Sequence, residues 1–145
     1  MPPPDYQITR GADAPVGGWL LVLCLLLMVW QPLSVGLTAS HALESLVLGG
    51  APLALLIVLR LLVAGMGIAA ALAIFNRRPS AVTLARVVLI ASAAADLIVY
   101  LTPYFPNNRA PGETPVFIAV SLIYSGVWLL YLARSRRVQR TFASV

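Results

Sequence analysis

Apolar positions fill four long runs of the chain, and short segments rich in proline, glycine and polar residues separate them. The runs cover residues 16–37, 52–75, 81–101 and 115–133. A helix of about 20 residues crosses roughly 30 Å of hydrocarbon. Because lipid offers no partners for free backbone groups, the runs predict helices. We therefore expect an all-α integral membrane protein, an antiparallel four-helix bundle.

Composition supports a membrane protein of one domain. Of the 145 residues, 60% are hydrophobic and only 10% are charged, whereas a soluble domain carries about a quarter charged residues. This excludes a disordered chain, a nucleic-acid-binding module and a disulfide scaffold. The single cysteine, Cys24, lies in an apolar run and is expected to pack as a small hydrophobe. The predicted parts are a tail at 1–15, a membrane domain at 16–133 and a basic tail at 134–145.

All ten basic residues are arginines, and they gather on one side of the predicted topology. Eight belong to the two tails, the second loop and the adjoining start of the third span: Arg10, Arg77, Arg78, Arg86, Arg134, Arg136, Arg137 and Arg140. The first and third loops hold Arg109 alone. The positive-inside rule therefore predicts that both termini are cytoplasmic. Six of these are also expected to attract anionic lipid, by about 1 kcal/mol per basic residue: Arg77, Arg78, Arg134, Arg136, Arg137 and Arg140.

Two ionisable residues, Arg60 and Asp96, lie within predicted spans. If the second and third spans form a hairpin centred on Arg78, Arg60 lies opposite Asp96. A charge near the middle of a membrane costs roughly 2.5–3.5 kcal/mol, so a partner is expected. We predict a salt bridge between them whose favoured role is to set helix register. The alternative role is a polar site for an ion, a proton or a ligand head group.

The same register predicts a helix-packing face of small residues. It places Ala64 opposite Ser92, Gly67 opposite Leu89, and Ala71 opposite Ala85. Small residues that share one helical face let membrane helices approach closely.

The fourth span carries an aromatic seam at helical spacing, formed by Phe117, Tyr124, Trp128 and Tyr131 together with Ser121. We expect the seam to pack against another span or a partner. The alternative is an aromatic wall for a lipid or a quinone-like ligand. Late in the first span, the pair Gln31-Pro32 predicts a kink, because proline removes a backbone donor.

The sequence contains no catalytic set of residues. His41 and Glu44 are three positions apart, but a metal site needs three or four ligands, and we interpret the two as exposed loop residues. We expect no enzymatic activity, no cofactor and no metal.

Both ends of the apolar region carry a recognisable motif. Gly17-Gly18-Trp19-Leu20 opens the first span. The C-terminal part contains Ser121-Leu-Ile-Tyr124, Trp128-Leu-Leu-Tyr131, Arg134-Ser-Arg-Arg-Val138 and Thr141-Phe142. The chain thereby resembles the bacterial membrane family called domain of unknown function 2569, whose members look alike in length and in having four predicted spans. The resemblance implies a bacterial cytoplasmic membrane, and a role in fold or partner binding for Tyr124, Trp128, Tyr131 and Arg137.

Two functions are compatible with these patterns. The preferred hypothesis is an accessory subunit of a larger membrane complex. The alternative is an oligomeric transporter, or a protein that handles a lipid or small ligand at Arg60 and Asp96. The expected partners are the bilayer, including anionic lipid at the cytoplasmic face, and a membrane protein or further copies of this chain, but no nucleic acid.

Overall fold

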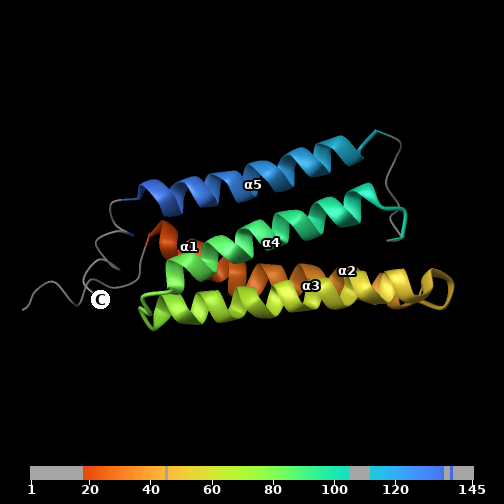
Figure 1. The fold of residues 1–145 in the computed structure, drawn as a ribbon, viewed down its shortest axis with the longest axis horizontal. Coiled ribbons are helices and arrows are strands. Elements are labelled where there is room, and N and C mark those ends of the chain that lie inside the picture. The colour runs from red at the N-terminus through yellow and green to blue at the C-terminus, as the bar shows by residue number, and fades with distance from the viewer. Residues whose placement is uncertain (1–17, 45, 105–111, 136–137, 139–145) are drawn as a thin grey trace, which may run out of the picture.

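The computed structural model describes residues 18–44, 46–104, 112–135 and 138, with the backbone alone for residues 41–44 and 46–49. In chain order its helical elements are α1 (Trp19–Leu25), the π-helix η1 (Leu26–Trp30), α2 (Gln31–Glu44), α3 (Leu46–Phe75), α4 (Ala81–Leu101) and α5 (Thr114–Arg134). Figure 1 labels the five α-helices. Within these described residues, four stretches are long and apolar enough to span a membrane: Trp19–Ser40, Gly50–Phe75, Ala81–Leu101 and Thr114–Arg134. The prediction of an all-helical protein with four such helices is confirmed. The antiparallel bundle and its cytoplasmic termini stay predictions.

The first span is one continuous rod with a π turn in its middle. In η1 the N–H of Gln31 donates to the carbonyl of Leu26, five residues back. Pro32 follows directly and has no N–H for the carbonyl of Met28, so the regular α-helical ladder is interrupted here. The predicted irregularity at Gln31-Pro32 is therefore a widened turn just before the proline.

The segment between the first two predicted spans is largely helical where the structure describes it. Helix α2 continues to Glu44 and α3 begins at Leu46. The backbone leaves helical geometry at Gly50, with φ 57° and ψ −152°. A side chain disfavours this region, so glycine is required for the bend before Pro52.

A short turn joins α3 to α4. Arg77 adopts a left-handed conformation with φ 51°, and the N–H of Arg78 donates to the carbonyl of Ala73 at 3.0 Å. This is a common way to end a helix, because it gives late carbonyls a partner. Since the turn is tight, the two helices return side by side with little freedom in register.

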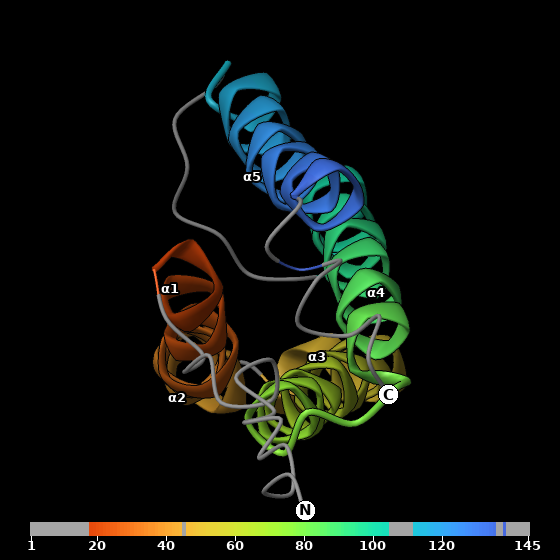
Figure 2. The same ribbon diagram turned by 90° about the vertical axis from the view of Figure 1, so that its left-hand side faces the viewer.

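Each span packs against the next along the chain, and the four spans together form an open arc. Figure 2 shows α3 and α4 between the first span and α5, which stand at the two ends of the arc. The larger core cluster fills the half of the molecule that contains the start of the first span, the α3–α4 turn and the end of α5; we call it the terminal half. Its buried residues are Leu20, Leu23, Cys24, Leu27, Ala70, Ala71, Ala73, Ile74, Ala81, Ala85, Val88, Leu89, Trp128, Leu132 and Val138.

The opposite half, which we call the distal half, is much less filled. Its buried cluster consists of Leu53, Leu56 and Val99, all from α3 and α4. Among the described residues, an aromatic contact joins the first span to α5 in the terminal half. There the rings of Trp19 and Trp128 lie 6.3 Å apart, edge to face.

The terminal half has two further ties to the end of α5. Arg86 Nη2 donates to the carbonyl of Leu132 at 3.1 Å, which gives one of the last carbonyls of the helix a charged donor. Val138, beyond the end of α5, is only 2% exposed and belongs to the same core cluster. The chain after α5 thus helps to close this end of the molecule.

Candidate functional site

The two ionisable residues of the spans meet in the distal half. Arg60 Nη2 lies 2.5 Å from Asp96 Oδ1, the pairing that the hairpin register predicts. Arg60 is ten residues after Gly50, about 15 Å along the helix, so the pair lies deep in the spanning region. The two side chains are 15% and 24% exposed, which shows that protein atoms do not seal the pair completely.

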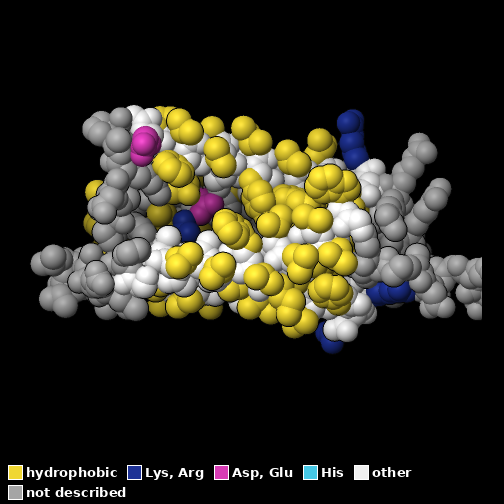
Figure 3. All heavy atoms as spheres, turned by 180° about the vertical axis from the view of Figure 1, so that it is seen from behind, with side chains coloured by type: hydrophobic (Ala, Val, Ile, Leu, Met, Phe, Trp, Pro, Cys, Tyr) yellow, Lys and Arg dark blue, Asp and Glu magenta, His cyan; other side chains and the backbone are white. Residues whose placement is uncertain are grey.

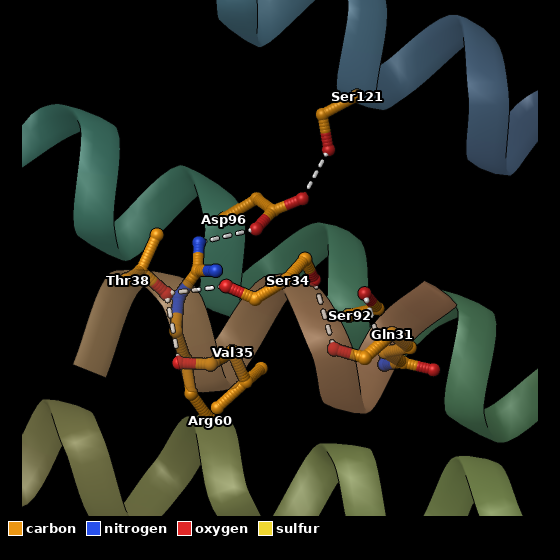
Figure 4. Close-up of polar contacts among 8 residues, drawn as sticks. All are labelled: Gln31, Ser34, Val35, Thr38, Arg60, Ser92, Asp96 and Ser121. Atoms are coloured by element: carbon orange, nitrogen blue, oxygen red, sulfur yellow. Dashed lines mark hydrogen bonds and ion pairs between the residues drawn. The ribbon is translucent and has the colours of Figure 1, made fainter. Parts of the chain in front are cut away.

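Asp96 also connects the hairpin to the fourth span. Ser121 donates its hydroxyl hydrogen to Asp96 Oδ2 at 2.7 Å. Figure 4 shows the carboxylate of α4 between Arg60 from α3 and Ser121 from α5. Both carboxylate oxygens therefore have partners, and one side chain holds three helices together.

A cavity of about 270 Å³ adjoins these residues, and all four spans contribute to its wall. Its polar lining comprises Gln31, Ser34, Arg60, Ser92, Asp96, Tyr100, Ser121 and Tyr124. Its apolar lining comprises Leu27, Trp30, Val35, Val63, Leu89, Ala95, Phe117 and Val120. Polar groups that converge inside a cavity with apolar wall residues are typical of a small-ligand site.

The cavity opens sideways, between the first span and α5. Three of its lining residues are well exposed: Trp30 at the end of η1 is 61% exposed, and Phe117 and Val120 on α5 are 42% and 60% exposed. Figure 3 shows basic and acidic atoms inside a hollow that apolar side chains surround. In a bilayer this opening would face acyl chains.

The first span contributes a polar face that the sequence pattern alone did not assign to the site. Gln31 Nε2 donates to Ser92 Oγ at 3.4 Å, and Ser34 Oγ donates to the carbonyl of Gln31 at 2.8 Å (Figure 4). Thr38 Oγ1 donates to the carbonyl of Ser34 at 2.8 Å. The signal was present in the sequence, since polar residues at 31, 34 and 38 share one helical face.

The predicted packing face needs one correction. Gly67 was expected to face Leu89 on α4, but it faces the first span. A Cβ built on Gly67 would lie 2.5 Å from Gln31 Oε1 and 3.2 Å from the carbonyl oxygen of Leu27. Because α3 lies between the first span and α4, its small residues serve two neighbours. Ala64, Ala71 and Ala85 are buried, and Ser92 lies at the cavity and accepts from Gln31.

Comparison with known proteins places the chain in a family. Residues 13–143 match the family described as "Protein of unknown function (DUF2569)". The chain belongs to this family. No curated protein and no solved structure matches it.

In this DUF2569 protein the aromatic seam divides between core and cavity. Trp128 is 7% exposed and makes edge contacts with Tyr124 and Tyr131, at centroid distances of 6.5 and 5.8 Å. Towards the distal half, Phe117 and Tyr124 line the cavity, and the ring of Phe117 lies 6.2 Å from that of Tyr100. The packing interpretation thus describes one end of the seam, and the other end is a wall of the cavity.

The remaining candidate residues whose side chains the structure describes do not line the cavity. Arg77 and Arg78 occupy the α3–α4 turn and Arg134 ends α5, whereas Arg136, Arg137 and Arg140 lie outside the described residues. The backbone of His41 and Glu44 is helical, and nothing further is described of either residue. Within the part of the chain that the structure describes, no group of three or more His, Cys, Asp and Glu could hold a metal ion.

Proposed function

We propose that this DUF2569 protein binds a membrane amphiphile, which enters the distal cavity from the lipid phase. The single observation that carries the proposal is the sideways opening of a polar cavity within the spanning region. Its polar floor provides hydrogen-bond partners for a head group, and its apolar rim suits a hydrocarbon chain. This develops the ligand-handling alternative that the sequence left open.

The packing of the terminal half supports binding in preference to passage across the membrane. The larger core cluster fills that half with buried side chains from all four spans. The contact between Trp19 and Trp128 joins the first span to α5 there. A molecule in the distal cavity would therefore have to separate packed helices to reach the other end.

The accessory-subunit hypothesis receives less support from this geometry. A protein that only docks on a larger complex has no need of a polar hollow, and intramembrane polar residues are costly unless they serve a purpose. The ion pair of Arg60 with Asp96 and the hydrogen bond from Ser121 to Asp96 satisfy these charges, but they do not require a cavity of about 270 Å³ beside them.

The proposal also includes the orientation of the protein in the membrane and the leaflet that its cavity faces. The arginines at the α3–α4 turn and at the end of α5 suit the cytoplasmic side by the positive-inside rule. The distal cavity then lies in the outer half of a bacterial cytoplasmic membrane, within an antiparallel bundle that has both termini inside. Its ligand would come from the outer leaflet, and the protein would bind it without chemical change.

Native mass spectrometry of the full-length protein, released from detergent micelles, tests the proposal. A matched pair of variants locates the ligand. Val120 lines the cavity and is 60% exposed, whereas Val127, two turns later on the same face, does not line it and is 59% exposed. Val120→Trp should fill the opening, and Val127→Trp adds the same bulk elsewhere.

We expect one amphiphile per chain on the wild-type protein and on Val127→Trp, and its loss from Val120→Trp. Equal and variable lipid adducts on all three proteins would contradict the proposal. Migration on native gels within a stoichiometric larger complex, with no lipid sensitive to Val120→Trp, would restore the accessory-subunit hypothesis.

A further inference from the structure

Among the residues that the structure describes, the cavity lining carries no net charge. Of its sixteen lining residues, Arg60 and Asp96 are the two with full charges, and +1 and −1 sum to zero. They are in direct contact at 2.5 Å. A ligand therefore meets a polar surface on which the positive charge of Arg60 is already balanced by the negative charge of Asp96.

The contacts of Asp96 argue against a charged head group. Its Oδ1 is paired with Arg60, and its Oδ2 accepts from Ser121 at 2.7 Å. An anionic head group would compete with this carboxylate for Arg60, and a cationic one would compete with Arg60 for the carboxylate. Either event leaves a surplus charge in the spanning region, where charges are expensive.

The serine hydroxyls at the cavity favour a ligand that donates a hydrogen bond. Ser121 uses its hydrogen on Asp96, and Ser34 uses its hydrogen on the carbonyl of Gln31. A hydroxyl has one hydrogen and two lone pairs, so each of these oxygens keeps the capacity to accept. A hydroxyl on the ligand would supply the missing donor and can also accept.

The size of the cavity limits how much of a ligand it can enclose. Ligand pockets usually have volumes of roughly 300–1,000 Å³, so a cavity of about 270 Å³ is near the small end of that range. That is enough for a small head group and the first carbons of a chain. The rest of the chain would leave past Trp30 and Val120, which are exposed at the opening.

We propose that the distal cavity selects an amphiphile with an uncharged, hydroxyl-bearing head group: a membrane alcohol, and neither a fatty acid anion, a phosphate ester nor a cationic lipid. This inference rests on the proposed function and names the ligand class for the same site. Selection follows from the neutral Arg60–Asp96 pair and the accepting oxygens of Ser34 and Ser121.

The test uses the full chain in nanodiscs of zwitterionic lipid and a photoreactive analogue of hexadecanol. Crosslinked residues are mapped by mass spectrometry, with Val120→Trp and Val127→Trp as the matched pair. Unlabelled hexadecanol, hexadecyl sulfate and hexadecyltrimethylammonium compete for the site. We expect labels on α2 and α5 that Val120→Trp alone removes. Hexadecanol should compete better than either ion by on the order of tenfold or more, given the cost of a charge in the membrane.

Charge variants separate charge from head-group size. Asp96→Asn gives the cavity a net charge of +1. The ability of hexadecyl sulfate to compete for the site, relative to that of hexadecanol, should therefore rise by on the order of tenfold. The double variant Arg60→Gln/Asp96→Asn is neutral and should restore the preference for hexadecanol. If hexadecyl sulfate does not compete better, relative to hexadecanol, in Asp96→Asn than in the wild-type protein, charge is not the basis of selection and the inference is overturned.

The outcomes also distinguish this inference from the proposed function. Strongest competition by an ion on the wild-type protein, with labels that Val120→Trp removes, overturns the neutral head group and leaves ligand binding in place. Labelling that is spread over the lipid-facing surface, with equal yield in both tryptophan variants, overturns both.

Discussion

At the scale of single residues, Asp96 is the side chain on which the distal half depends. It accepts from Arg60 on α3 and from Ser121 on α5, and it reaches the cavity. Two charged residues inside spans predict a pair, since each alone is costly. Ser121 gave no comparable signal, because a single serine is inexpensive in a membrane helix and has many ways to satisfy its hydroxyl.

Removal of one charge should destabilise the protein more than removal of both. We expect Asp96→Asn to lower the free energy of unfolding by about 3 kcal/mol, because Arg60 loses its counter-ion in a poorly solvated place. The double variant Arg60→Met/Asp96→Leu should lose less, because no unpaired charge is left. Unfolding in detergent, with denaturant titration and tryptophan fluorescence, measures both. A loss in the double variant as large as that in Asp96→Asn, or larger, would show that the unpaired charge of Arg60 is not what destabilises the single variant.

At the scale of elements, close approach of α3 to the first span depends on Gly67. The side chain of Gln31 and the carbonyl of Leu27 occupy the place where a Cβ would be. Because lipid tails are as apolar as the helices, packing between membrane helices relies on such close contacts. The π turn before Pro32 belongs to the same contact, since Leu27 lies within it and Gln31 follows it directly.

Two neighbouring glycines of α3 provide a matched test of this contact. Gly67→Ala should destabilise the protein by roughly 1–3 kcal/mol, a range typical of overpacking. A Cβ built on Gly65 would meet no atom of a neighbouring helix within 4 Å, so Gly65→Ala should be neutral or stabilising by up to about 1 kcal/mol through helix propensity. Thermal unfolding in one detergent compares the two. If the order is reversed, the contact of Gly67 with the first span is not important for stability.

At the scale of the whole molecule, the distribution of packing is unequal between the two halves. A large cluster closes the terminal half, and the distal cluster is confined to α3 and α4. The arginines at the α3–α4 turn lie at the closed end, because Ile74 and Ala81 on either side of the turn belong to the large cluster. The orientation in the membrane therefore decides which leaflet the cavity faces, and with it the source of any ligand.

Labelling of single cysteines tests this orientation. In a Cys24→Ala background, Ser80→Cys lies after the α3–α4 turn and Glu113→Cys lies before α5, and both positions are exposed. We expect a membrane-impermeant maleimide to label Glu113→Cys on intact cells, and Ser80→Cys only after permeabilisation. The opposite pattern would reverse the topology and place the cavity in the inner leaflet.

The sequence by itself determined the features that depend on local chemistry. The number of spans follows from the number of long apolar runs. The register of α3 against α4 follows from a turn that is too short to allow slippage. For this reason the pairing of Arg60 with Asp96 could be predicted from the sequence. The break at Gly50 before Pro52 also follows from residue type. Only the tertiary structure decided how the first span and α5 stand around that hairpin.

The arrangement of the first span and α5 around the α3–α4 hairpin forms the candidate site. The neighbour of Gly67, the donor from Ser121, the polar face of Gln31 and Ser34 and the cavity among them all depend on which helix faces meet. Apolar helix faces are nearly equivalent to one another and to lipid, so hydropathy does not specify their partners. Shape and a few interhelical hydrogen bonds do, and these arise only when the spans are assembled.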